Sequence, residues 1–159
     1  MLIYILFQPL KIKQQEFGDV PVLTMGSFVM YELESTGLQT IMAGSKALRY
    51  TERYIVDDVN FTDNSKEFIS NMQADNGIYK NNIIDLKGNV LYEREDGLTF
   101  ESDTLNYNTK NSIAQTQDDY LAHRDKNSMR GASFVYDSIN NTMKSKQVTV
   151  QYQLKESKI

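Results

Sequence analysis

From residue 28 onward, apolar and polar residues alternate with a period of two, which is the pattern of half-buried β-strands. The clearest stretch begins at Ile83, where Ile84, Leu86, Val90 and Tyr92 share one face and polar residues occupy the other. A similar alternation places apolar residues on one side of the first strand, over residues 28–33. The pattern therefore predicts long strands with one apolar face.

Clusters of Asp, Asn and Gly separate these strands and predict tight turns. Polar turns are expected at residues 34–37, 75–77, 94–97, 108–111, 124–127 and 137–141. The Asp96-Gly97 pair suits a hairpin connection especially well. Further strands are then expected over residues 113–123, 129–136 and 143–153, with no linker between them. The chain is predicted to be one all-β domain whose apolar face closes as a sandwich, a barrel or a jelly roll.

Two segments depart from the simple alternation. After Asp103 the apolar positions shift by one residue to Leu105 and Tyr107, which predicts a β-bulge in a long strand. Residues 45–56 place Ala47, Tyr50 and Tyr54 at helical spacing. Two short strands are favoured there because strands flank the segment, and a short helix is the alternative.

Composition and charge narrow the function. The 159 residues are 40% hydrophobic and 24% charged, as in an ordinary folded domain. The net charge is −4 and Lys and Arg form no cluster, which argues against nucleic-acid binding. The absence of cysteine excludes disulfides, thiolate nucleophiles and Cys-ligated metals.

No group of residues predicts catalysis. His123 is the only histidine, and its position before a turn is typical of a solvated surface residue. The pairs Asp57-Asp58 and Asp118-Asp119 are adjacent, so in a strand their side chains would point to opposite faces. Glycine-rich phosphate loops and the Gly-x-Ser-x-Gly elbow are absent from the sequence. We therefore expect a binding protein with no enzymatic activity, metal or cofactor.

Residues 1–7, with the sequence MLIYILF, form a continuous apolar run that ends at Gln8 and Pro9. Seven helical residues would cover about 10 Å, whereas a bilayer core needs about 20 residues. One interpretation is that residues 1–13 are the remnant of an amino-terminal membrane anchor. The other is a first strand or an adhesive terminus.

Residues 83–107, IIDLKGNVLYEREDGLTFESDTLNY, resemble the repeat of the lipopolysaccharide-export proteins LptC and LptA. The matching positions are a Leu-x-Gly-Asn-Val strand at 86–90 and a Leu-x-Tyr at 105–107. Met129-Arg130-Gly131, Tyr136-Asp137 and the strand over 148–152 also fit, so the resemblance extends over about residues 28–153. The order of an apolar lead followed directly by the domain favours the LptC family.

The resemblance implies a twisted, open β-jelly roll of long antiparallel strands over residues 20–155, standing in the periplasm and attached to the inner membrane by its anchor. Such a protein receives lipopolysaccharide from an inner-membrane ABC transporter of the LptF/LptG kind. It holds the acyl chains in its groove and passes the molecule to an LptA-like bridge protein toward the outer membrane. The alternative function is a structural or protein-binding β-sandwich with a packed core and no lipid ligand.

The predicted site residues follow from the strand order. We expect the lipid-binding groove to be lined by Ile84, Leu86, Val90, Tyr92, Leu98, Phe100, Leu105, Phe134, Val148, Val150 and Tyr152. We expect partner edges at Val29, Tyr31 and Leu33 toward the transporter, and at Gln147, Thr149, Gln151 and Gln153 toward the bridge protein.

Overall fold

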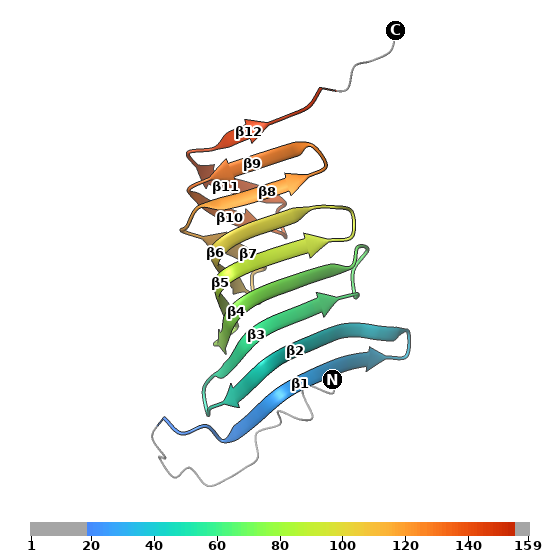
Figure 1. Ribbon diagram of the computed structural model, residues 1–159, viewed down its shortest axis with the longest axis vertical. Coiled ribbons are helices and arrows are strands. Elements are labelled where there is room, and N and C mark those ends of the chain that lie inside the picture. The colour runs from blue at the N-terminus through green and yellow to red at the C-terminus, as the bar shows by residue number, and fades with distance from the viewer. Residues whose placement is uncertain (1–18, 155–159) are drawn as a thin grey trace.

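The structure, a computed structural model, describes residues 19–154 (Figure 1). Those residues form a single 12-stranded sheet in which every pairing is antiparallel. The strands are β1 Leu23–Glu34, β2 Gly37–Arg49, β3 Tyr54–Asp63, β4 Ser70–Lys80, β5 Ile83–Arg94, β6 Thr99–Asn108, β7 Ile113–Thr116, β8 Tyr120–Arg124, β9 Asn127–Gly131, β10 Ser133–Asp137, β11 Thr142–Lys146 and β12 Thr149–Gln151.

The sheet divides at β6. Strands β1 to β6 lie beside one another in chain order, but β6 pairs with β8 through residues 99–102 and with β7 through residues 106–108. The sheet therefore continues as two branches, β8-β9-β12 and β7-β10-β11. Figure 1 shows the first branch in front of the second. The sheet is thus an open jelly roll, as predicted, and its divergence at β6 gives it two walls.

A line of irregular positions crosses the sheet and bends each of the long strands β3, β4 and β5. The backbone is left-handed at Asp58, Gly88 and Asn89, and the pairing register shifts beside residues 74–75 and 88–89. The same line continues through residues 117–119, 132 and 147–148, which separate the short strands. We call this line the crease, and it marks where a β-bulge or a break redirects each strand.

The crease separates two walls. Wall A contains residues 28–34, 38–43, 59–63, 70–74, 90–94 and 99–102 with β8, β9 and β12. Wall B contains residues 23–26, 46–49, 54–57, 76–80, 83–87 and 104–108 with β7, β10 and β11. The inner faces of the two walls pack against one another along the crease, and we call the apolar surface that they form together the groove.

The predicted turn at 75–77 is wrong, because these residues lie inside β4 at the crease. Gly77 is buried there, and an added Cβ would lie 3.0 Å from Val59 Cγ2 and 3.2 Å from Leu86 Cδ2. The glycine allows Val59 of wall A to pack against wall B. The true turn after β4 lies at Asn81 and Asn82, both in the left-handed conformation that Asn tolerates.

Other predictions about the strands are confirmed in outline. The parity shift after Asp103 is present, since Phe100, Ser102 and Leu105 are all buried. Residues 45–56 form the end of β2 and the start of β3 rather than a helix. The three strands expected over 113–123, 129–136 and 143–153 are each divided by the crease into two shorter strands.

The hydrophobic core lies along the crease, at the base of the groove. Val90 is 1% exposed and is surrounded by other buried side chains of both walls. The core consists of Ala47, Val56, Val59, Ala74, Leu86, Val90, Phe100, Leu105 and Tyr120. Residues farther from the crease are only half-buried, so each wall continues outward as a partly exposed apolar surface.

Candidate binding groove

Wall A presents a continuous row of apolar side chains to the groove, one from each of nine strands. Cross-strand partners share a face, so the pairing register defines the row. Its members are Met30, Met42, Phe61, Met72, Tyr92, Phe100, Ala122, Met129 and Val150. We call it the methionine row. Met fills irregular space and adapts to its contacts, which suits a surface that accepts flexible chains.

Wall B presents a matching row, also one residue from each of nine strands. Its members are Leu23, Arg49, Tyr54, Tyr79, Ile84, Tyr107, Ala114, Tyr136 and Met143. We call it the tyrosine row. The Tyr54 and Tyr79 rings lie 6.0 Å apart, and the Arg49 guanidinium lies 5.6 Å from the centre of the Tyr54 ring.

Aromatic side chains join the two walls in the carboxyl-terminal part of the groove. The Phe134 ring of wall B lies 5.2 Å from Phe100 and 5.4 Å from Tyr120, both of wall A. Phe100 and Tyr120 stack at 5.6 Å. We call Phe100, Tyr120 and Phe134 the aromatic cluster. These rings therefore occupy the space between the walls in this part of the groove.

A hydrogen bond across the groove accompanies the cluster. The Tyr120 hydroxyl of β8 lies 2.8 Å from the Ser145 hydroxyl of β11, and Ser145 donates to the Ser133 carbonyl at 2.6 Å. Gly131 makes this approach possible, because an added Cβ would lie 2.6 Å from Ser145 Oγ and 2.7 Å from Tyr120 Cε1. The bond therefore fastens β8 of wall A to β11 of wall B.

A cluster of ion pairs, formed by Arg94, Asp96 and Arg124, lies at the outer edge of wall A. Arg94 donates two hydrogen bonds to Asp96, at 2.7 and 2.8 Å, and Arg124 lies 3.3 Å from the same carboxylate. The bonds from Arg94 hold the pKa of Asp96 well below its usual range, and Asp96 in turn raises the pKa of Arg94. The cluster ties the β5–β6 turn to the end of β8.

Most of the predicted groove residues share the inner faces. Ile84, Leu86, Val90, Tyr92, Phe100, Leu105, Phe134 and Val150 all lie there by register or by packing against the core. The remaining three lie at its margins. Leu98 is in the turn before β6, Val148 is in the crease and 44% exposed, and Tyr152 follows β12 and is 70% exposed.

The predicted partner edges lie at opposite ends of the sheet. Val29, Tyr31 and Leu33 are exposed on β1, which has no second neighbour among residues 19–154. Thr149 and Gln151 lie on β12 at the other end. Gln147 is in the crease, and the Gln153 backbone N–H donates to the Asn127 side chain at 3.0 Å.

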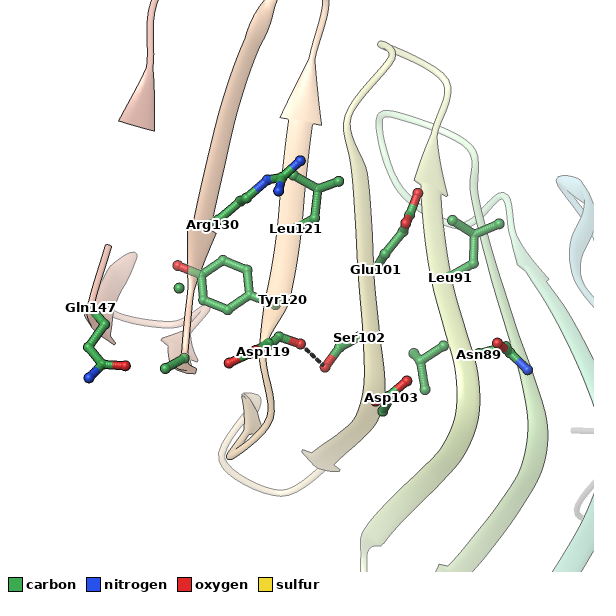
Figure 2. Close-up of a pocket in the computed structure, with 13 residues that line it drawn as sticks. Asn89, Leu91, Glu101, Ser102, Asp103, Asp119, Tyr120, Leu121, Arg130 and Gln147 are labelled. Atoms are coloured by element: carbon green, nitrogen blue, oxygen red, sulfur yellow. Dashed lines mark hydrogen bonds between the residues drawn. The ribbon is translucent and has the colours of Figure 1, made fainter. Parts of the chain in front are cut away.

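A second concavity, of about 730 Å³, lies against wall A at the crease (Figure 2). Its lining mixes Leu91 and Leu121 with the charged Glu101 and Arg130. A hydrogen bond of 3.0 Å from Ser102 to the Asp119 carbonyl, drawn in Figure 2, holds the bend between β7 and β8. The polar lining distinguishes this concavity from the apolar groove.

The described residues 19–154 contain no His, Cys, Asp and Glu grouping suited to a metal ion. His123 is half-buried in β8, paired in register with Thr99 and Ser128. The arrangement offers apolar surface for a ligand rather than a nucleophile with its base.

Sequence reasoning found only Tyr92, Phe100 and Val150 of the methionine row and only Ile84 of the tyrosine row. Met30, Met42 and Met72 were omitted, as were Tyr54 and Tyr79. A strand period of two placed each of them on a face, but it did not show that the faces of six successive strands align. The position of each bulge along its strand decides that alignment.

The fold and the groove define an open β-jelly roll with two walls and an apolar interior. The chain matches the model of the family described as lipopolysaccharide-assembly, LptC-related, over residues 1–153, and it belongs to that family. Its function is lipopolysaccharide transport. A search of curated proteins finds no match to this sequence.

A solved structure with a similar fold is LptH of Pseudomonas aeruginosa, the LptA-homologous periplasmic component of the lipopolysaccharide transport device. The TM-score is 0.53 at 14% sequence identity, and the match covers 85% of this chain and 96% of LptH. The predicted jelly-roll fold and family resemblance are therefore confirmed.

The predicted anchor remnant at residues 1–13 lies outside the described residues. Within residues 19–154, no helix is long and apolar enough to cross a membrane.

Proposed function

We propose that this protein receives lipopolysaccharide from an inner-membrane ABC transporter and passes it to an LptA-like bridge protein. The observation that carries the proposal is the groove, whose two rows each cross nine strands. The rows join the edge at β1 to the edges at β11 and β12. The protein would act at the periplasmic side of the inner membrane, as its family does.

Acyl chains would bind here through removal of apolar surface from water, at about 25 cal/mol per Å². The methionine row and the predicted residues Ile84, Leu86, Val90, Phe100 and Leu105 supply such surface without directional chemistry. Transfer along the groove then needs no covalent step, and the energy for directional movement would come from the transporter.

The two ends of the sheet support the proposed direction of transfer. Edge strands carry unpaired backbone groups that accept a further strand. A transporter jelly roll would add to β1 beside Val29, Tyr31 and Leu33. The bridge protein would add to the other end, where Thr149 and Gln151 lie on β12 and exposed Val150 extends the methionine row.

Photocrosslinking to purified lipopolysaccharide tests the groove. A photoreactive residue replaces Met72 in the methionine row, and a matched variant carries it at Gln73, the next residue of β4, on the outer face. Crosslinking at 72 but not at 73 is expected. Equal crosslinking at both positions, or none at either in a folded protein, would contradict lipid binding in the groove.

Photocrosslinking in cells tests the two proposed docking edges, at β1 and at β12. A photoreactive residue at Tyr31 should capture the transporter, and one at Val150 should capture the bridge protein. Capture of the bridge protein at Tyr31 and of the transporter at Val150 would reverse the proposed direction of lipid transfer. Capture of neither would show that the edges are not the docking surfaces.

A further inference from the structure

The outer face of β3 carries a sequence that the groove does not use, Asp58-Val59-Asn60-Phe61-Thr62. Asn-x-Ser/Thr, in which x is not Pro, is the acceptor signal for an asparagine-linked glycan on an exported protein. Alternate residues of a strand share a face. Val59 is 6% exposed in the core and Phe61 belongs to the methionine row, so both point inward. Asn60 and Thr62 therefore lie on the outer face, where Asn60 is exposed.

One side chain of β4 contacts both polar groups of this sequence. Asn71 Nδ2 donates to Asn60 Oδ1 at 2.7 Å and to Thr62 Oγ1 at 2.9 Å. The nitrogen of the Asn60 amide donates no hydrogen bond to another of residues 19–154. A glycan on this nitrogen would leave the amide oxygen in place, so the bond from Asn71 would be retained. The folded sheet can therefore carry a glycan at Asn60 without losing a hydrogen bond.

The chain has a second Asn-x-Thr sequence, which begins at Asn140 in the β10–β11 turn. Asn140 Nδ2 donates to Asp137 Oδ2 at 2.7 Å, and the Asn140 backbone N–H donates to Asp137 Oδ1 at 3.0 Å. These bonds join residues three apart, so the turn can form them before any strand pairs. The bond between Asn60 and Asn71 joins residues eleven apart and needs β3 beside β4. In an unpaired chain, Asn60 is therefore the freer amide.

Charge also distinguishes the two sequences. Asp58 lies two residues before Asn60, is exposed at the crease, and makes no hydrogen bond or ion pair within residues 19–154. The equivalent position before Asn140 is Ser138, whose hydroxyl donates to the Ser112 carbonyl at 3.0 Å. A carboxylate offers an enzyme a charge-assisted hydrogen bond, which is stronger than the bond to a neutral hydroxyl. Asp58 therefore supplies a recognition element that the second sequence lacks.

We propose that Asn60 is the acceptor of an asparagine-linked oligosaccharide and that the transferase recognises it through Asp58, Asn60 and Thr62. The donor is an oligosaccharide carried on a polyprenyl diphosphate at the periplasmic face of the membrane. The Asn60 nitrogen attacks the anomeric carbon of the first sugar and loses one proton to a base of the transferase. The bond from that carbon to the phosphate oxygen breaks, and the polyprenyl diphosphate leaves.

Transfer to Asn60 precedes the folding of the sheet. β3 is paired with β2 on one side and with β4 on the other, so the folded strand cannot enter a second binding cleft in extended form. Once the sheet has formed, the glycan extends from the outer face and leaves the groove open. The inference rests on the periplasmic location in the proposed function and goes beyond it, because it does not depend on lipid binding.

Mass spectrometry of the full chain, purified from the cells that naturally make it, tests the inference. Trypsin places the two candidate sites in separate peptides, residues 54–66 and residues 131–144. We expect the first peptide to carry the added mass of an oligosaccharide and the second to carry none. Asn60→Gln should abolish the added mass. A peptide 54–66 without added mass in the unsubstituted protein would overturn the inference.

Two neighbouring carboxylates provide a matched pair of variants for the recognition of Asp58. Asp58→Asn removes the charge and keeps a residue that tolerates the left-handed backbone at this position. It should lower the glycosylated fraction of Asn60 to that of Asn140. Asp57→Asn removes the adjacent charge and should leave the glycosylated fraction unchanged. An equal glycosylated fraction in the two variants would show that Asp58 is not recognised.

The order of transfer and folding is tested with folded protein produced in cells that lack such a transferase. Incubated with membranes that hold the transferase and its lipid-linked donor, the folded protein should gain no mass. Glycosylation of the folded protein as complete as that in cells would overturn the proposed order. None of these measurements uses lipopolysaccharide. A failure of lipid crosslinking and an absence of the glycan are therefore separate results.

Discussion

At the amino-terminal end of the sheet, the groove is lined by methionines that are only half-buried, such as Met25 and Met42. Toward the carboxyl-terminal end, the rings of Phe100, Tyr120 and Phe134 contact one another across the groove. The first region has flexible side chains in the groove, and its walls meet at the crease, where Val59 packs beside Gly77. The second has rigid side chains and walls that are fastened together.

The difference indicates that the carboxyl-terminal region mainly stabilises the fold, whereas the amino-terminal region mainly binds the ligand. A small open sheet needs some region where apolar surface is removed from water, and the largest buried side chains, those of the aromatic cluster, provide much of it. The amino-terminal end then keeps its apolar surface available for a ligand. Replacing the same kind of side chain at the two ends should therefore have different consequences.

The largest difference is expected from truncation of a groove side chain at each end. Phe100→Ala should lower the free energy of unfolding by about 3 to 5 kcal/mol, because it opens a cavity among buried rings. Met42→Ala should cost about 1 kcal/mol, since the side chain is already half-exposed. Urea denaturation followed by circular dichroism measures both. Similar losses of unfolding free energy in Phe100→Ala and Met42→Ala would show that the two ends contribute equally to stability.

Adding a methyl group at each end provides the next test. Gly131→Ala should destabilise by about 2 kcal/mol, because the new Cβ would overlap Ser145 and Tyr120. Gly26→Ala in β1 should be neutral or stabilising by about 0.5 kcal/mol, since nothing lies within 4 Å of the added Cβ and the unfolded chain loses freedom. Thermal melting of the two variants measures the contrast. A neutral Gly131→Ala would show that β8 and β11 are not tightly apposed.

The sequence was sufficient to predict Phe100 and Phe134 of the aromatic cluster, but not Tyr120 and not the methionine end. Phe100, Phe134 and Val90 lie in strands with a regular alternation, and the family resemblance covers the same stretch. Met42 lies in β2, where residues 38–43 are all half-buried and the apolar positions do not alternate. Periodicity alone therefore could not place Met42 in the groove.

The bends were the other feature that local patterns could not determine. Asp75-Asn76-Gly77 has the composition of a turn, yet it continues through β4 because Gly77 packs against Val59 across the crease. That contact joins residues far apart in the sequence. The pattern did predict the shift after Asp103, since there the bend changes which residues are apolar.

A smaller effect is expected from the hydrogen bond across the groove. Tyr120→Phe removes the hydroxyl that lies 2.8 Å from Ser145 and should lower the free energy of unfolding by about 1 kcal/mol. Ser145 keeps its bond to the Ser133 carbonyl, so it is not left unsatisfied. Tyr92→Phe is the matched control and should change stability little. Chemical denaturation of both variants decides whether the bond fastens the walls.

The smallest effect concerns an ion pair at each end and depends on pH. The folded pKa of Asp96 is lowered, so its contribution is fully present above the unfolded pKa of about 3.9 and is lost as pH falls through the folded pKa. Asp96→Asn should therefore melt below the unmodified protein at pH 7, and this difference should shrink below about pH 4. Asp19→Asn, which removes the exposed partner of Arg53 at the amino-terminal end, should change the melting temperature little at either pH. A difference for Asp96→Asn that stayed constant down to pH 2 would show that the carboxylate charge does not fasten the β5–β6 turn to β8.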